Sequence, residues 1–217
     1  MTARLLARAP DFRVDTLTRR RLVVLLTVIA AAVMVCLAVA SLADADFVAM
    51  FQENGPVEAV QAALYGLAAL AFFGAAAAMQ ERLHRLAFVG LGLFVASLML
   101  RELDFTHSDA PSLVLLFNSR GTIAVMILVW LAFAALSLRD PLGLMAAGLR
   151  WATGRGGRPL LVAAALLLLG SLFDHHYLPL GRTIDLVGEE VLELVAAVLV
   201  LVSALAAIQV SRAATAA

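Results

Sequence analysis

The chain has little charge and almost no cysteine. Its 217 residues include one cysteine, Cys36, which excludes an intrachain disulfide framework and a cysteine-based metal site. Charged residues make up 15% of the chain, against about 25% in soluble domains. Lysine is absent, so all sixteen basic residues are arginine, and sixteen acidic residues balance them. Hydrophobic residues make up 63% of the chain, which indicates a membrane protein and excludes an ordinary soluble domain.

Six apolar runs are long enough, or nearly long enough, to cross a bilayer. They cover residues 22–42, 57–79, 86–100, 121–138, 159–173 and 186–210. A spanning helix needs about 20 apolar residues, and a helix pairs every backbone group within lipid. The runs 86–100 and 159–173 are short, and they span only if the polar residues after them continue the helix. The sequence therefore predicts an all-α integral membrane bundle of six transmembrane helices over residues 22–210.

The arginines fall on one side of this bundle. Thirteen of them lie in the segments 1–21, 80–85, 139–158 and 211–217, and three lie in the other connections. The positive-inside rule assigns the arginine-rich side to the cytoplasm, so we expect both termini to be cytoplasmic. Residues 1–21 then form an arginine-rich arm and residues 211–217 a short tail. Because topology accounts for the arginine excess, it gives no indication of nucleic-acid binding.

One cytoplasmic connection, residues 139–158, is longer than the other one, residues 80–85. It contains Gly154, Gly156, Gly157 and Pro141, and Trp151 belongs to it. It lacks a phosphate-binding glycine pattern followed by lysine and serine or threonine. We therefore expect a flexible connection whose arginines serve orientation.

The acidic residues show the opposite distribution. Twelve of the sixteen lie in outer connections or at outer helix ends, together with three of the four histidines. Acidic residues contribute little to topology, so orientation does not explain this excess. Glu189, Glu190 and Glu193 occupy the first two turns of the last run, and carboxylates this close repel one another unless they are protonated or balanced by a cation.

Arg101 is the one basic residue expected at hydrocarbon depth on the outer side. A buried carboxylate needs a hydrogen-bonded cation, so we predict that Arg101 pairs with Glu58 or Glu193. Glu58 opens the second run, and Gln61 and Tyr65 follow it at spacings of three and four residues. These three positions form a polar stripe that enters the bilayer.

Candidate metal ligands lie at the same outer face. Asp104 and His107 follow the third run three residues apart, and Asp174, His175 and His176 follow the fifth run. Their nitrogen and oxygen atoms suit zinc, iron or manganese. The spacing matches no strong ligand motif, but the donor set predicts a divalent metal held by Asp104, His107, Asp174 and either His175 or His176, since adjacent histidines cannot both point inward from a regular helix.

Three functions fit this arrangement. The first is a metal-dependent enzyme, a hydrolase acting on a membrane lipid or lipid-linked substrate, with Glu190 or Glu193 as general base on a metal-bound water. In it Arg101 orients a substrate anion or holds Glu58. The second is a proton- or ion-coupled carrier that uses Glu58, Arg101 and Glu193 as a relay, although the chain lacks the internal repeat typical of carriers. The third is a non-catalytic assembly or sensing subunit held together by buried ion pairs.

Three motifs carry a resemblance to known proteins. The segments ENGPxE at 53–58, RELDF at 101–105 and EExxEL at 189–194 resemble those of multi-pass bacterial inner-membrane proteins, and the likeness in layout covers most of the chain. It implies a bacterial inner-membrane location and no particular activity. More loosely, the chain is similar to the alkaline ceramidase-like membrane hydrolases, which combine an early glutamate-rich segment with aspartate and histidine metal ligands. That similarity implies a metal-dependent hydrolase, although the last run here lacks the histidine pair of that family.

Overall fold

The computed structural model describes residues 50–51, 55–103, 120–174 and 182–216, and these residues form α-helices and no strand. The helices are α3 (Pro56–Ala78), α4 (Arg82–Glu102), α6 (Arg120–Ser137), α7 (Pro141–Thr153), α8 (Arg158–Asp174) and α9 (Arg182–Ala216). The prediction of an all-α chain is confirmed for this part of the protein. The predicted arginine-rich arm, residues 1–21, and the first predicted span, residues 22–42, lie outside the described residues.

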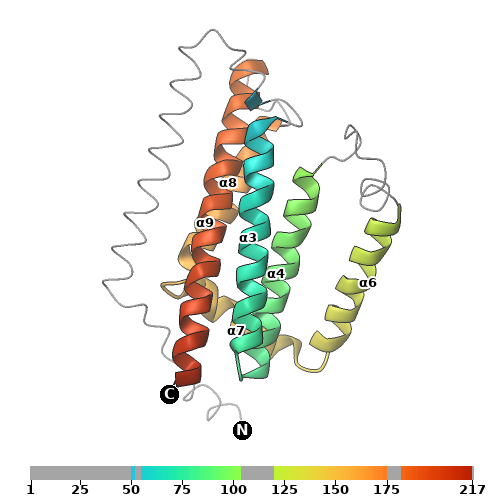
Figure 1. The fold of residues 1–217 in the computed structure, drawn as a ribbon, viewed down its shortest axis with the longest axis vertical. Helices are drawn as coiled ribbons and strands as arrows, with labels where there is room; N and C mark the ends of the chain where they lie inside the picture. Colours follow the sequence, from blue (N-terminus) through green and yellow to red (C-terminus); the bar gives the residue numbers. More distant parts are fainter. Residues whose placement is uncertain (1–49, 52–54, 104–119, 175–181, 217) are drawn as a thin grey trace.

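Helix α3 is the centre of the bundle. It packs along α4 on one side and along α9 on the other, and α8 packs along α9 (Figure 1). Small residues let these helices approach closely, as is usual between membrane helices. Ala68, Ala75 and Ala204 are fully buried in the core, and Gly92 of α4 lies against the ring of Phe73, where a Cβ atom would come within 2.7 Å of a ring carbon. The sequence therefore builds a bundle in which alanine and glycine set the helix spacing.

Helix α6 stands apart from this bundle and contacts it through α4 (Figure 1). Trp130 Nε1 donates a hydrogen bond to Ser97 Oγ at 3.2 Å, and Phe133 covers Gly90, which has no Cβ to block the ring. Several other large side chains of α6, including Ile123, Leu128 and Leu131, are exposed, as expected of a helix that faces lipid.

Three helical segments are long and apolar enough to cross a membrane. They are α3, α4 and residues Asp185–Ala214 of α9. At 1.5 Å per residue a helix of this length covers about 30 Å or more, which matches the hydrocarbon core of a bilayer. Helix α4 begins four residues before the short predicted run 86–100 and continues through Glu102, so polar ends do extend this span.

The remaining apolar helices are shorter or bent. Residues Ile123–Ser137 and Pro141–Thr153 together are apolar enough for one span, but they meet at an angle of 104°. Helix α8 contributes the shorter apolar stretch Arg158–Leu172. The chain is thus a helical membrane protein with three candidate spans among its described residues, or four if the bent pair is one span.

The expectation of a flexible connection over residues 139–158 is wrong. Pro141–Thr153 form α7, which begins at an N-cap: the Asp140 side chain accepts a hydrogen bond from the Gly143 amide at 2.9 Å, and Pro141 takes the first helical position. Trp151 is buried, with its ring edge-to-face against Phe88 at 5.1 Å between centroids. This aromatic contact anchors α7 to the bundle through Trp151, which belongs to the core.

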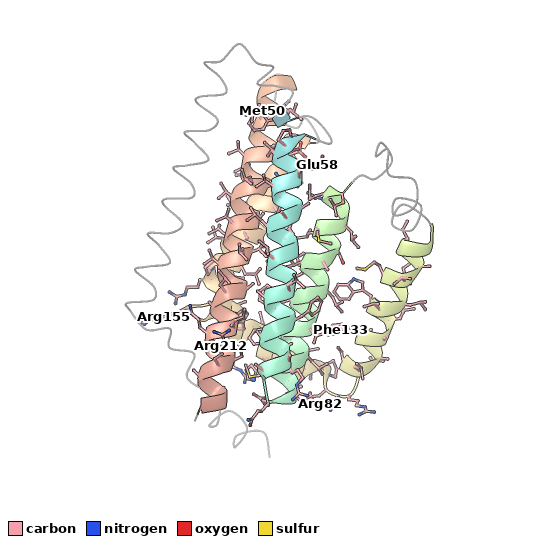
Figure 2. All side chains as sticks on the ribbon, viewed as in Figure 1. Met50, Glu58, Arg82, Phe133, Arg155 and Arg212 are labelled. Carbon is pink, nitrogen blue, oxygen red and sulfur yellow. The ribbon has the colours of Figure 1, made fainter. Side chains whose placement is uncertain are left out.

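The two ends of the bundle differ in charge. Figure 2 labels Arg82, Arg155 and Arg212 near one end and Glu58 near the other. The charge asymmetry predicted from the sequence is therefore present in three dimensions among the described residues.

Candidate functional site

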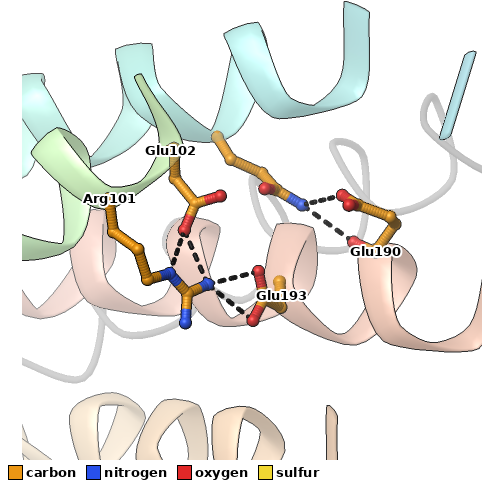
Figure 3. Close-up of polar contacts among 5 residues, drawn as sticks. Arg101, Glu102, Glu190 and Glu193 are labelled. Atoms are coloured by element: carbon orange, nitrogen blue, oxygen red, sulfur yellow. Dashed lines mark hydrogen bonds and ion pairs between the residues drawn. The ribbon is translucent and has the colours of Figure 1, made fainter. Parts of the chain in front are cut away.

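The candidate site lies where α3 and α9 begin and α4 ends. Arg101 and Glu102 occupy the last turn of α4, and Glu190 and Glu193 lie in the first half of α9 (Figure 3). Helix α3 lies between these two helices and contributes Gln61 to the same polar contacts. The antiparallel order of the helices thus gathers polar residues from three distant parts of the sequence.

Arg101 joins two buried carboxylates. Its Nη2 donates to both carboxylate oxygens of Glu193 at 2.6 Å, and its Nε donates to Glu102 Oε1 at 2.9 Å (Figure 3). The carboxylate side chains are 6% exposed for Glu102 and 8% for Glu193, whereas Arg101 is 54% exposed. Charge-assisted contacts of this kind compensate the desolvation of the two carboxylates. The predicted pairing of Arg101 with Glu193 is confirmed.

A second contact links α3 to α9. Gln61 Nε2 donates to Glu190 Oε2 and to the Glu190 backbone oxygen, each at 3.0 Å (Figure 3). Gln61 is fully buried, while Glu190 is partly buried. Both oxygens of Glu193 accept hydrogen bonds from Arg101, whereas among the described side chains the Glu190 carboxylate accepts a hydrogen bond from the neutral amide of Gln61. The two glutamates therefore differ: Glu193 is neutralised by a cation, and Glu190 is held by an amide.

Two buried polar atoms beside these contacts have no hydrogen-bond partner within the described part of the chain. They are the Tyr65 hydroxyl and Gln61 Oε1, and both side chains are fully buried. Tyr65 lies one turn after Gln61 on the same face of α3. Buried polar groups in native proteins are normally paired, which makes these two atoms the place where a ligand or water is expected.

Helix α8 closes the site from the far side of α9. A Cβ atom on Gly170 would lie 3.6 Å from Glu193 Cγ and 3.8 Å from the Glu189 backbone oxygen. Glycine at this position lets α8 approach the glutamate-bearing turns of α9. The last turn of α8, which ends at Asp174, follows immediately.

The predicted site residues are described to different extents. Arg101, Glu190 and Glu193 come together as stated above, and Glu58 is partly buried in the first turn of α3 at the same end. Asp174 ends α8, but its side chain is not among those described. The other four predicted metal ligands lie outside the described residues: Asp104, His107, His175 and His176. Among the residues that are described, no group of three or more histidine, cysteine, aspartate or glutamate side chains is arranged to hold a metal.

Two residues of the site, Glu102 and Gln61, were not among the predicted functional residues. Glu102 is adjacent to Arg101 in the sequence, and this adjacency of opposite charges at a span end is a signal that points to it. Gln61 was recognisable as part of the polar stripe with Glu58 and Tyr65, but its partner lies 129 residues away. That partner depends on how α3 is rotated against α9, which the sequence of one helix does not specify.

Comparison with known proteins adds nothing to this geometry. No family model, curated protein or solved structure matches the chain. A functional assignment therefore depends on the geometry of the site itself, which is formed by Arg101, Glu102, Glu190, Glu193 and Gln61.

Proposed function

We propose that the chain is a six-span protein of the bacterial inner membrane with both termini in the cytoplasm. We further propose that the end of the bundle that holds Glu102, Glu190 and Glu193, its carboxylate end, is a metal-dependent hydrolytic site for a lipid or lipid-linked substrate. One observation carries this proposal: the ends of α4 and α8 both converge on the turns of α9 that hold Glu190 and Glu193. Those two ends lead directly into the segments 104–107 and 174–176, which hold the candidate metal ligands.

The position of the arginines supports the orientation. Arg82 and Arg85 lie in the first turn of α4, Arg155 lies between α7 and α8, and Arg158 begins α8, at the end of the bundle away from Glu190 and Glu193. Arginine in short connections marks the cytoplasmic side of a membrane protein. The polar site then faces the outer side, at the boundary between lipid and water.

The donor set fits a divalent metal. Asp104, His107, Asp174 and one of His175 and His176 would hold it, since carboxylate oxygen and imidazole nitrogen suit zinc, iron or manganese. The metal would supply Lewis-acid activation of an oxygen atom. The protein would supply a proton acceptor and a fixed charge network around it.

Glu190 is the better candidate for the general base. Both oxygens of Glu193 already accept hydrogen bonds from Arg101, whereas Glu190 is held by Gln61 and is partly accessible. A general base must be able to take up a proton, and a carboxylate engaged by a guanidinium is less able to do so. We therefore assign proton transfer to Glu190 and positioning to Arg101, Glu102 and Glu193.

The depth of the polar stripe favours a one-sided site over a carrier. Below Tyr65 the buried positions of α3 are apolar, namely Ala68, Ala69, Phe72, Ala75 and Ala76. A relay for protons or ions needs polar groups through the membrane. Along the described part of α3 the buried polar groups end at Tyr65, so the stripe opens to one side.

A second candidate is a non-catalytic assembly or sensing subunit, favoured by the Arg101 network itself. One guanidinium compensates two buried carboxylates and joins α4 to α9, which is what a purely structural ion pair does.

Elemental analysis of the purified full-length protein separates the two candidates. The enzyme proposal expects about one zinc, iron or manganese per chain, lost in a His107→Ala/His175→Ala/His176→Ala variant. The control is His84→Gln, which changes the histidine at the opposite end of α4 and is expected to retain the metal. Wild-type protein without stoichiometric metal would overturn the enzyme proposal and leave the structural one.

A further inference from the structure

The segment that holds α7 and the turn into α8 has an excess of positive charge. Residues 139–158 contain one acidic residue and four arginines, namely Arg139, Arg150, Arg155 and Arg158. The acidic residue, Asp140, accepts a hydrogen bond from the Gly143 amide as the cap of α7. Arg158 Nε donates to a neutral partner, the Thr153 backbone oxygen. Within the described residues no ion pair involves these arginines, so the positive charge of the segment is not compensated there.

Arg150 is the one partly buried arginine of the four. It lies in the last turn of α7, and its Nε atom is buried without a hydrogen-bond partner in the described part of the chain. A guanidinium is always protonated and can only donate, so this N–H group needs an acceptor. Membrane orientation explains arginine on one side of the bundle, but it does not explain a guanidinium nitrogen buried without an acceptor. A ligand with anionic oxygen atoms fits this position.

The turn after α7 is held against the bundle. A Cβ atom on Gly156, which is buried, would lie 2.6 Å from the Trp151 ring and 3.3 Å from Ala206 Cβ of α9. Arg155, which precedes this glycine, is exposed. Figure 2 shows Arg155 at the edge of the bundle, at the end that also holds Arg82 and Arg212. The backbone of the turn is therefore packed in place, while its arginine is free to reach a ligand at the surface.

Helix α7 has an exposed apolar stripe that leads to the same turn. Leu142, Met145 and Leu149 follow one another at spacings of three and four residues, and they are 74%, 60% and 56% exposed. The opposite face of α7 holds Ala147 and Trp151, which are buried in the bundle. Residues Pro141–Thr153 meet the preceding helix at 104°, so α7 runs across the direction of that helix. A helix in this orientation, with an apolar stripe beside arginines, is typical of the headgroup layer of a membrane.

We propose that the end of α7 and the turn after it bind an anionic phospholipid. Arg150 and Arg155 hold the phosphate of the lipid, and the apolar stripe of α7 contacts its acyl chains. Arginine suits this role because its guanidinium matches phosphate oxygens in pairs. A zwitterionic headgroup would add a cation, and Asp140, the one carboxylate of the segment, is already engaged by the helix cap. The site is independent of the proposed hydrolase, because it lies at the other end of the bundle.

Lipid binding is measured by native mass spectrometry of the full-length protein. The protein is offered equal amounts of phosphatidylglycerol and phosphatidylcholine with matched acyl chains. Both lipids carry one phosphate, but only phosphatidylglycerol has a net negative charge, so we expect it to be retained about fivefold more strongly or better. Equal retention of the two lipids would overturn the proposal.

Matched double variants separate a site from the general charge of this end of the bundle. Arg150→Gln/Arg155→Gln is expected to lower the preference for phosphatidylglycerol severalfold. Arg82→Gln/Arg212→Gln removes the same charge from the same end and is expected to keep the preference. An equal loss in both double variants would overturn the site. Arg155→Gln alone changes an exposed residue and keeps the measurement valid if the half-buried Arg150 is needed for folding. An unchanged preference in that single variant would also contradict the proposal.

A soluble phosphate and the apolar stripe distinguish a lipid from a free phosphate. Glycerol 3-phosphate carries a phosphate without acyl chains and is expected to leave phosphatidylglycerol bound at millimolar concentration. Met145→Ser/Leu149→Ser is expected to weaken retention of phosphatidylglycerol severalfold, because it removes apolar surface from the stripe. Leu128→Ser/Leu131→Ser makes the same kind of change on the exposed face of α6 and is the control. Release of the lipid by glycerol 3-phosphate, or unchanged retention in Met145→Ser/Leu149→Ser, would overturn the assignment of a lipid.

Discussion

Arginine has two different roles at the two ends of the bundle. At one end Arg85 Nε donates to the Met79 backbone oxygen at 2.9 Å, and Arg158 Nε donates to the Thr153 backbone oxygen at 3.3 Å. These partners are six and five residues away, at helix ends whose carbonyl groups lack partners within the helix. At the other end Arg101 reaches Glu193, 92 residues away. The comparison shows that one residue type stabilises a local turn in one place and joins distant helices in another.

The two ends also bury different groups. The core at the arginine end is aromatic and includes Phe88 and Trp151. The core at the carboxylate end includes Glu102, Glu193 and Gln61, which are buried with their partners. Stability at the first end therefore depends on packing, and stability at the second depends on charge compensation. Four substitutions test this difference.

The largest effect is expected for Trp151→Ala. Removing a buried aromatic ring costs about 3–5 kcal/mol of the free energy of unfolding. Gly156 also packs on this ring, where a Cβ atom would lie 2.6 Å from it, so the site has little freedom to close. Thermal unfolding of the detergent-solubilised protein measures the loss. Arg155→Ala, four residues further along the chain, is the control and should change stability by less than about 0.5 kcal/mol.

Arg101→Ala is expected to cost about 3 kcal/mol, because it leaves two buried carboxylates without their cation. The same unfolding measurement applies, with Arg82→Ala at the opposite end of α4 as the control of small effect. Adding Glu193→Gln to Arg101→Ala should recover part of the loss, since it removes one of the uncompensated charges. Simple additivity of the two changes would contradict a direct pair.

Gln61→Leu is expected to cost about 1–2 kcal/mol, because the Glu190 side chain and backbone oxygens each lose a hydrogen bond. Gln80→Leu, an exposed change just beyond the other end of α3, is the matched control. If the two variants unfold at the same temperature, the hydrogen bonds from Gln61 to Glu190 contribute nothing to stability.

The smallest effect is expected for Tyr65→Phe. The Tyr65 hydroxyl has no hydrogen-bond partner in the described residues, so its removal should change the free energy of unfolding by less than about 0.5 kcal/mol. Tyr65→Ala, which also removes the buried ring, should cost several times more. A large loss in Tyr65→Phe would mean that the hydroxyl is bonded within the protein.

Much of this arrangement could be predicted from the sequence. Apolar runs predicted the helices, and the need of a buried carboxylate for a cation predicted the contact between Arg101 and Glu193. Both predictions follow from a strong physical requirement. Backbone groups without hydrogen-bond partners and charges without a counter-charge are both costly in lipid. The gathering of carboxylates at one end followed from the same reasoning.

The rest depends on how the helices are rotated against one another. Gln61 faces Glu190 only because α3 packs along α9 at one particular rotation, and a polar stripe by itself does not identify its partner. Helix α7 lies where the sequence predicts a flexible connection, because the glycines and arginines of residues 139–158 are also typical of loops. Asp140 and Pro141 form an N-cap and a first helical position that are typical of a helix start. Burial of the Trp151 side chain then stabilises the helix against the bundle.

Arg101 and Glu193 are 92 residues apart in the sequence, and this separation has a consequence for biosynthesis. Ribosomes deliver α4 well before α9, so Arg101 and Glu102 enter the membrane before Glu193 has been translated. During that interval Glu102, which is adjacent to Arg101 in the chain, is the carboxylate available to neutralise the Arg101 guanidinium. The final helix then locks the assembly at the end of translation, and a ribosome stalled before α9 would leave an incomplete protein open to quality-control proteases.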